Sequence, residues 1–125
     1  MIVATGVDLV ELDRLQRVLE ERGSRFVARV YTAAEVQYCS AQAQPVTSFG
    51  ARFAAKEAVL KCLGTGWGRG VGFTDVEVLR GPSGAVGVRL SGEAAVVARS
   101  LGITRIHLSL SHTKGHAVAF AVAEA

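Results

Sequence analysis

The carboxy-terminal segment of the sequence predicts a β-hairpin, and this constrains the possible folds more than any other segment. Residues 105–111 alternate strictly between apolar and polar side chains, which is the period of a strand with one buried face. The apolar positions are Ile106, Leu108 and Leu110, and the polar ones are His107, Ser109 and Ser111. Residues 112–115 then predict a turn, and residues 116–123 a returning strand. A hairpin is incompatible with a purely helical fold, and the apolar face of its sheet needs a covering layer.

The rest of the chain predicts elements that can supply this layer. β-branched residues and alternation indicate further strands over residues 2–10, 73–79 and 86–90. Helical spacing, N-caps and glycine stops predict helices over residues 11–21, 26–31, 32–40, 48–63 and 91–101. The expected class is α+β, with helices packed on a mostly antiparallel sheet.

Composition indicates how the core is packed. The chain has 125 residues, of which 50% are hydrophobic but only 6% are aromatic. We therefore expect a single domain over residues 1–125, with a core built mainly from Ala, Val, Leu and Ile. Small side chains allow elements to approach one another closely, and they also suit contacts between subunits.

Net charge and cysteine content indicate which cellular compartment and which kinds of partner to expect. A net charge of +3 favours an acidic or phosphorylated partner and leaves nucleic acids, nucleotides and acidic proteins open. Cys39 and Cys62 stand apart, without a CxxC motif or histidines at metal-binding offsets. No signal peptide is visible, and the apolar run at 118–123 is far shorter than the ~20 residues that cross a bilayer. We expect a cytoplasmic protein that does not engage a membrane.

Several common functions lose support because their motifs are missing. The sequence contains no P-loop, no helix-opening GxGxxG after a strand, no HExxH and no GxSxG. It also has no aromatic RNA-binding strand, and its few aromatic residues argue against a nucleic-acid-binding domain that stacks bases.

Glu57 is the most informative residue, because it interrupts the apolar stripe of the predicted helix over residues 48–63. That stripe consists of Phe49, Phe53, Leu60 and Leu63. A carboxylate on such a face needs a compensating charge, because burying it alone costs several kcal/mol. Two readings remain open: an i,i+4 ion pair with Lys61, or a metal ion shared with Asp8 at the predicted first strand.

Two carboxylates without a His or Cys cluster suit a hard cation such as Mg²⁺, which is often held by one or two carboxylates plus substrate phosphates. Basic residues stand near both acids: Arg14 follows Asp8, and the predicted helix of Glu57 also carries Arg52, Lys56 and Lys61. The backbone at residues 64–66 (Gly-Thr-Gly) could also approach a phosphate, although a glycine after a helix is usually only a C-cap.

For the other polar residues, both a structural and a functional role are possible. His112 lies in a predicted turn, where a lone histidine is more often a surface residue than a catalyst. The arginines of the first helices are either a solvated face or a docking surface for an acidic protein. Cys62 could be a reactive thiol, but on an alanine-rich helix packing is the usual role.

Together, three separated motifs resemble the holo-acyl-carrier-protein synthase family, the short bacterial phosphopantetheinyl transferases. The first is Gly-Val-Asp-Leu-Val-Glu at residues 6–11. The second is Arg-Phe-Ala-Ala-Lys-Glu-Ala at 52–58, followed by Lys61 and Gly-Thr-Gly at 64–66. The third is His-Leu-Ser-Leu-Ser-His at 107–112, so the resemblance covers the whole chain.

The resemblance implies a fold, a reaction and site residues. The fold would be that of the 4'-phosphopantetheinyl transferases. The enzyme would transfer 4'-phosphopantetheine from coenzyme A to a serine of apo acyl carrier protein and release adenosine 3',5'-bisphosphate. Asp8 and Glu57 match the family's magnesium ligands, and Lys61 and His112 match groups at the coenzyme's phosphates or the reacting centre. The expected catalytic residues are Glu57, Lys61 and His112, and the expected coenzyme contacts are Arg52, Lys61, Gly64, Thr65, Gly66 and His112.

The resemblance also implies partners. The family forms homotrimers with sites at subunit interfaces, and its basic surface receives the acidic carrier protein; here that surface would be Arg14, Arg17, Arg22 and Arg25. The glycine-rich residues 66–70 could form a flap over coenzyme A. The alternative function is a coenzyme A or nucleotide-binding module without catalysis, which would not require Asp8 and Glu57 together.

Overall fold

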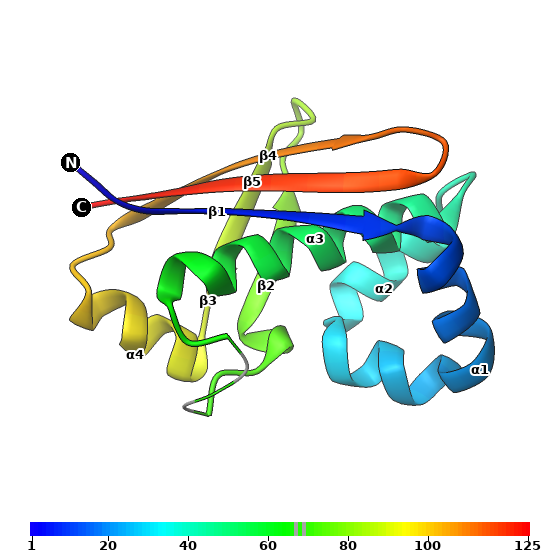
Figure 1. The fold of residues 1–125 in the computed structure, drawn as a ribbon, viewed down its shortest axis with the longest axis horizontal. Helices are drawn as coiled ribbons and strands as arrows, with labels where there is room; N and C mark the ends of the chain where they lie inside the picture. The colour runs from blue at the N-terminus through cyan, green and yellow to red at the C-terminus, as the bar shows by residue number, and fades with distance from the viewer. Residues whose placement is uncertain (67, 69) are drawn as a thin grey trace.

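Two antiparallel sheets and four helices make up the structure, a computed structural model that describes residues 1–66, 68 and 70–125. The larger sheet has the strand order β1-β5-β4, formed by β1 (Ile2–Glu11), β4 (Arg105–His112) and β5 (His116–Glu124). The chain termini lie side by side at one end of this sheet, where Ile2 pairs with Glu124 (Figure 1). The α+β class predicted from the sequence is confirmed.

The long helix α3 (Pro45–Leu63) lies along the inner face of the three-stranded sheet (Figure 1). Small residues make the close packing possible on both sides of this interface. On β5, Ala117, Ala119, Ala121 and Ala123 are fully buried, and on α3 so are Ala54, Ala55 and Ala58. The core is therefore built from closely approached small side chains, as the low aromatic content predicted.

The second sheet and the remaining helices pack around α3. Strands β2 (Val76–Arg80) and β3 (Val86–Leu90) form a two-stranded ribbon, flanked by α2 (Ala33–Ser40) and α4 (Gly92–Ser100). A capping box precedes α2: Thr32 accepts a hydrogen bond from the Glu35 amide, and the Glu35 side chain accepts one from the Thr32 amide.

Helix α1 (Leu12–Val30) is bent at Gly23, whose φ of 31° and ψ of −113° are not helical. The sequence predicted two helices separated by residues 23 and 24, and the bend occurs at that point. A conformation with positive φ favours glycine, because other residues meet a steric penalty there. The bend allows the second half of α1 to turn back toward α3 (Figure 1).

Some predicted boundaries were wrong. Helix α3 begins at Pro45 rather than at residue 47 or 48, because proline suits the first turn of a helix, where its missing N–H costs nothing. Phe73–Asp75 forms a short 3-10 turn, so β2 starts only at Val76. The first strand ends at Glu11, one residue beyond the predicted end.

A buried ion pair joins α2 to α3. The Lys56 ammonium is fully buried, lies 2.7 Å from Glu35 Oε1, and donates to the carbonyl oxygens of Phe73 (3.1 Å) and Val76 (2.6 Å). The second oxygen of Glu35 accepts from the Val78 amide at 2.8 Å. Burial lowers the pKa of Lys56, and the Glu35 carboxylate opposes that shift.

We expect Lys56→Met to lower the free energy of unfolding by about 3–5 kcal/mol, because the Glu35 carboxylate would remain buried without its partner. Urea unfolding followed by circular dichroism measures the change. Lys61→Met is the matched control, since the Lys61 side chain is 51% exposed and its ion pair is worth about 1 kcal/mol or less. Equal unfolding midpoints for the two variants would contradict this account.

Candidate functional site

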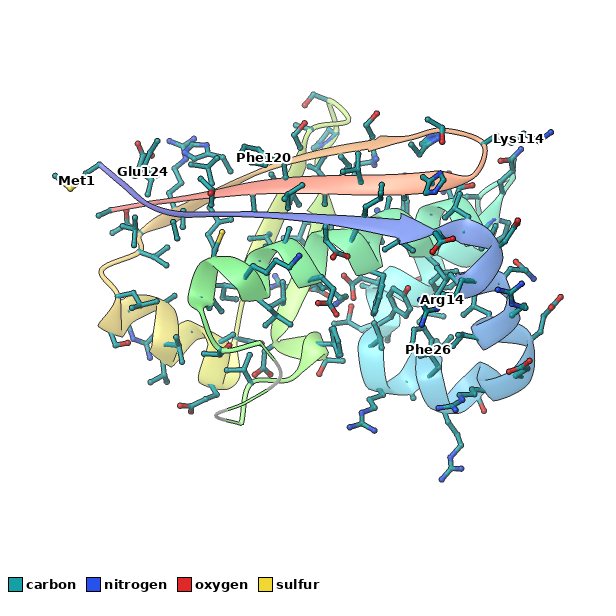
Figure 2. All side chains as sticks on the ribbon, in the orientation of Figure 1. Met1, Arg14, Phe26, Lys114, Phe120 and Glu124 are labelled. Atoms are coloured by element: carbon teal, nitrogen blue, oxygen red, sulfur yellow. The ribbon has the colours of Figure 1, made fainter. Side chains whose placement is uncertain are left out.

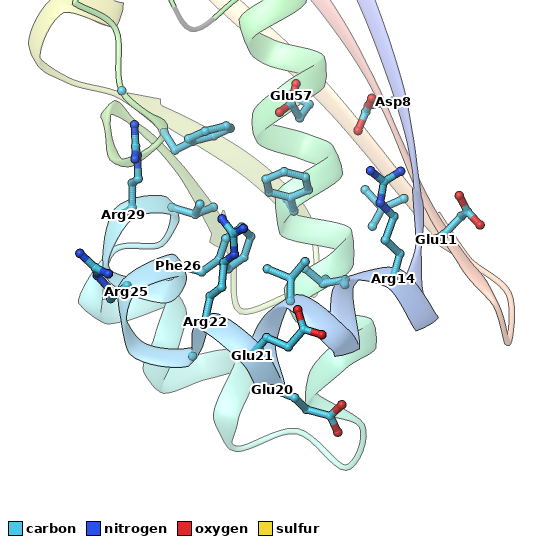
Figure 3. Close-up of a pocket in the computed structure, with 18 of the residues that line it drawn as sticks. Asp8, Glu11, Arg14, Glu20, Glu21, Arg22, Arg25, Phe26, Arg29 and Glu57 are labelled. Atoms are coloured by element: carbon cyan, nitrogen blue, oxygen red, sulfur yellow. The ribbon is translucent and has the colours of Figure 1, made fainter.

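A groove of about 1550 Å³ between α1, β1 and α3 contains both predicted metal ligands. Asp8 comes from β1 and Glu57 from α3, and both carboxylates face the groove (Figure 3). On β1 the even-numbered residues face α3, so Asp8 lies on the same side of the strand as the buried Gly6 and Val10. The two acids, far apart in sequence, are thus brought to one site.

Lys61 is the nearest cation to Asp8. Its ammonium lies 3.3 Å from Asp8 Oδ1 and donates to the Val7 carbonyl oxygen at 2.7 Å. The sequence left open an ion pair between Lys61 and Glu57 on the same helix, but in the structure the ammonium crosses to β1. With Lys61 51% and Asp8 21% exposed, this pair is weak, and a cation or phosphate can displace it at little cost.

The donor set suits a hard cation that also uses substrate oxygens. Asp8 and Glu57 offer carboxylate oxygens, and among the described residues no cluster of three or more His, Cys, Asp or Glu could enclose a metal ion. Zinc sites typically need three or four such ligands, whereas Mg²⁺ commonly takes one or two carboxylates, waters and phosphate oxygens. The residues present therefore fit Mg²⁺ bound together with a phosphorylated substrate.

Three phenylalanines form an apolar wall beside the carboxylates. Phe26 from α1, Phe53 from α3 and Phe73 all line the groove. The ring centroids of Phe26 and Phe53 are 5.8 Å apart, and those of Phe53 and Phe73 are 5.6 Å apart. The sequence placed Phe53 on an apolar helix stripe but gave no sign that the three rings meet at a site.

Arginines form the rim of the groove. Arg14 points toward Asp8, and Arg22, Arg25 and Arg29 extend from the bent end of α1 (Figure 3). Arg17 is also exposed but does not line the groove. Within the described part of the chain none of these side chains forms an ion pair, so their charge is available to a partner. Arg29 was not among the predicted docking residues, although the sequence shows it on the same helix face.

The segment 64–66 follows the carboxy-terminal end of α3. Gly64 adopts a left-handed conformation with φ of 73° and caps the helix, as predicted, and Gly66 has φ of 55°. The Thr65 hydroxyl donates to the Gly66 carbonyl at 3.2 Å. Trp67 and Arg69, which belong to the predicted flap, lie outside the described residues.

His112 lies away from the two acids within this chain. It ends β4 and pairs with Ala117 of β5, which separates β4 from β1. Its side chain is on the same sheet face as Asp8 but at the opposite edge, roughly 12 Å away, since the two residues are separated by two strand spacings across the sheet and two residues along it. The structure of one chain does not bring His112 to the groove.

Arg52 also lies outside the groove. It is 3% exposed and lines a second, smaller pocket with Tyr38 and Arg80. Its guanidinium stacks over the Tyr38 ring at 4.1 Å and donates to Ser48 Oγ at 3.3 Å. The Nε atom of Arg52 is buried and has no hydrogen-bond partner among the described residues. Lys56, which the sequence placed near the acids, instead points into the core toward Glu35.

Comparison with known proteins identifies the family. A model of the 4'-phosphopantetheinyl transferase superfamily matches residues 4–121. The chain belongs to this superfamily. Among curated members it is 48% identical to the holo-[acyl-carrier-protein] synthase of Koribacter versatilis over 124 residues, covering 99% of both chains, and 44% identical to that of Solibacter usitatus, again covering 99% of both. The resemblance stated from the sequence motifs is confirmed.

Solved structures of superfamily members agree with this assignment. The holo-[acyl-carrier-protein] synthase of Neisseria meningitidis superimposes with a TM-score of 0.92 at 32% identity, covering 100% of each chain. The Bacillus anthracis enzyme, solved in complex with CoA (3',5'-ADP), gives 0.82 at 35% identity, covering 100% of this chain and 98% of the other. In the present chain, none of the described helices is long and apolar enough to span a membrane.

Proposed function

We propose that this enzyme transfers the 4'-phosphopantetheine group of coenzyme A to a serine hydroxyl of apo acyl carrier protein and releases adenosine 3',5'-bisphosphate. The observation that carries the proposal is that Asp8 and Glu57 line one groove rimmed by arginines, in a chain that matches the superfamily almost end to end. A coenzyme A-binding module without catalysis would not need two carboxylates from separate elements in one groove.

Asp8 and Glu57 would hold Mg²⁺. When bound, the ion supplies positive charge against the pyrophosphate of coenzyme A, where negative charge develops during transfer. Lys61, already beside Asp8, would turn its ammonium toward a phosphate oxygen. Phe53 and Phe73 line the same groove and, with substrate bound, would limit the access of water to the carboxylates. Glu57 and His112 are the candidate acceptors of the serine proton.

We further propose a homotrimer in which His112 of one chain reaches the groove that holds Asp8 of a neighbouring chain. The outer face of the three-stranded sheet is apolar and exposed in one chain: Val7 is 52%, Leu9 62% and Phe120 46% exposed. Figure 2 shows Phe120 on the side of the sheet away from α3. Exposed apolar patches of this kind typically mark protein contacts. Residues 64–66 would contact the coenzyme A phosphates, and Arg52, the further predicted contact, would have to leave its buried position against Ser48 and Tyr38 to join them.

The carrier protein would dock on the arginines of α1. Arg14, Arg17, Arg22 and Arg25 are exposed, and Arg29 adds a further charge at the rim. An acidic partner is attracted to such a surface over a Debye length of about 8–10 Å near physiological ionic strength. The reaction would take place in the cytoplasm, where the buried, unpaired Cys39 and Cys62 remain reduced.

Asp8→Asn and Glu57→Gln test the proposed ligands with side chains of similar shape. We expect each to reduce transfer about 100-fold or more, because several kcal/mol of charge stabilisation are lost. Intact-mass analysis of apo carrier protein incubated with coenzyme A, with Mg²⁺ or a chelator, measures the adduct. Glu20→Gln, at the groove rim, is the control. Full activity in Asp8→Asn and Glu57→Gln would refute the assignment.

Reversal of two rim charges, Arg22→Glu with Arg25→Glu, tests the docking surface. We expect the KM for apo carrier protein to rise about tenfold or more at low salt, and the difference from wild type to shrink at high salt as the charges are screened. Steady-state kinetics at two ionic strengths measures this. The control is Arg99→Glu on the exposed side of α4. A KM that is unchanged at low salt would disprove this docking site.

Phe120→Glu tests the assembly. A charge on the apolar sheet face should give a monomer by light scattering and, because His112 is then absent from the groove, strongly reduced transfer. Val96→Glu, which places a charge on an equally exposed apolar residue of α4, should leave both the mass and the activity unchanged. A fully active monomeric Phe120→Glu variant would show that the site is complete within one chain.

A further inference from the structure

The closest approach between β1 and α3 occurs at Gly6. A Cβ atom built on Gly6 would lie 2.0 Å from the carbonyl oxygen of Ala58 and 3.2 Å from Lys61 Cβ. Real Cβ atoms essentially never come within 3.0 Å of such an atom. The backbone of β1 therefore packs directly on the backbone of α3 at this point, and any residue with a Cβ atom would require the backbone to shift.

This contact lies beside both proposed metal ligands. Asp8 is two residues beyond Gly6 on the same face of β1. On α3, Glu57 immediately precedes Ala58, and Lys61, the partner of Asp8, is three residues further along. The two carboxylates thus extend from either side of one backbone contact, and the separation between β1 and α3 at that contact determines how far apart they are.

We propose that Gly6 is a positioning residue: it sets the spacing at which Asp8 and Glu57 reach a common divalent cation. The inference rests on the proposed function, in which these two residues bind Mg²⁺. Gly6 itself touches neither metal nor substrate. Its role is the absence of a side chain, which lets the strand approach the helix closely enough for both carboxylates to serve one ion.

The steric clash that a side chain at position 6 would create cannot easily be relieved. The obstructing atom is a backbone oxygen, so shortening a side chain on α3 cannot make room, and β1 must move by about 1 Å. β1 is paired with β5 along its length, with Gly6 opposite Ala121, and the Cys62 thiol of α3 contacts the Ala121 carbonyl at 3.7 Å. A shift at Gly6 is thus transmitted to Asp8, and displacements of about 1 Å can cost 100-fold in catalysis.

Gly6→Ala tests the proposal, with Gly87→Ala as the matched control. Gly87 also lies in a strand, and a Cβ there meets nothing within 4 Å. The readout is Mn²⁺ binding, followed by electron paramagnetic resonance on the enzyme with saturating coenzyme A and no carrier protein, so that no turnover occurs. We expect Gly6→Ala to weaken Mn²⁺ binding about tenfold or more and Gly87→Ala to leave it unchanged.

Parallel measurements on Asp8→Asn separate this inference from the proposed function. If Asp8→Asn weakens Mn²⁺ binding but folded Gly6→Ala binds as wild type does, the positioning role of Gly6 is overturned and the metal site stands. If Asp8→Asn itself binds Mn²⁺ normally, the metal site fails and the inference with it. A loss of thermal stability alone, with normal Mn²⁺ affinity, assigns Gly6 a purely structural role.

A second measurement covers the case in which Gly6→Ala does not fold in buffer alone. Trimethylamine N-oxide is excluded from protein surfaces and favours the folded state. The Mn²⁺ titration is then repeated in this osmolyte for Gly6→Ala, Gly87→Ala and the wild type. A weaker affinity in Gly6→Ala alone supports the proposal, and equal affinities overturn it.

Discussion

The geometry of the candidate site depends on how closely α3 lies against the three-stranded sheet. That distance is set by the smallest residues in the interface: the buried alanines of β5 and α3, and Gly6. Larger residues on this face would force the layers apart, since protein interiors tolerate little extra volume. The small residues that accompany the low aromatic content thus allow α3 to lie close enough to the sheet for Asp8 on β1 and Glu57 on α3 to share a groove.

The opposite side of α3 is held by a different interaction, the buried pair of Lys56 and Glu35. Lys56 and Glu57 are adjacent in sequence, but successive helical residues point about 100° apart. One residue therefore points into the core, where it binds the Phe73 carbonyl, and the next faces the groove that Phe73 helps to line. The motif at residues 52–58 thus has two neighbouring residues with different roles: Lys56 holds Phe73 in place, and Glu57 faces the groove.

Alternation and helix signals in the sequence were sufficient to predict the class, the hairpin and most elements. The predicted stripe around Glu57 was less reliable, because α3 is buried on almost all sides and small residues weaken its helical periodicity. The pairing of Lys56 with Glu35 and the meeting of three phenylalanines arise from tertiary contacts that no local pattern records. The site role of His112 came from the family resemblance, whereas Arg52 was also placed near the acids because it shares the helix of Glu57, and one chain brings neither to the groove.

Charge is layered across this surface in a way that matches two different ligands. The carboxylates lie within the groove, where a small cation can be enclosed together with phosphate oxygens, whereas the guanidiniums stand at the rim in water. Rim charges act mainly on the rate of encounter with an acidic partner, because solvent and salt screen them once contact is made. Groove charges would act more strongly once a bound substrate displaces water from around them. Under the proposed function, the arginine-rich helix would recruit a protein, while the two inward carboxylates would hold a diphosphate only through a bound cation, so the two ligands would not compete for the same groups.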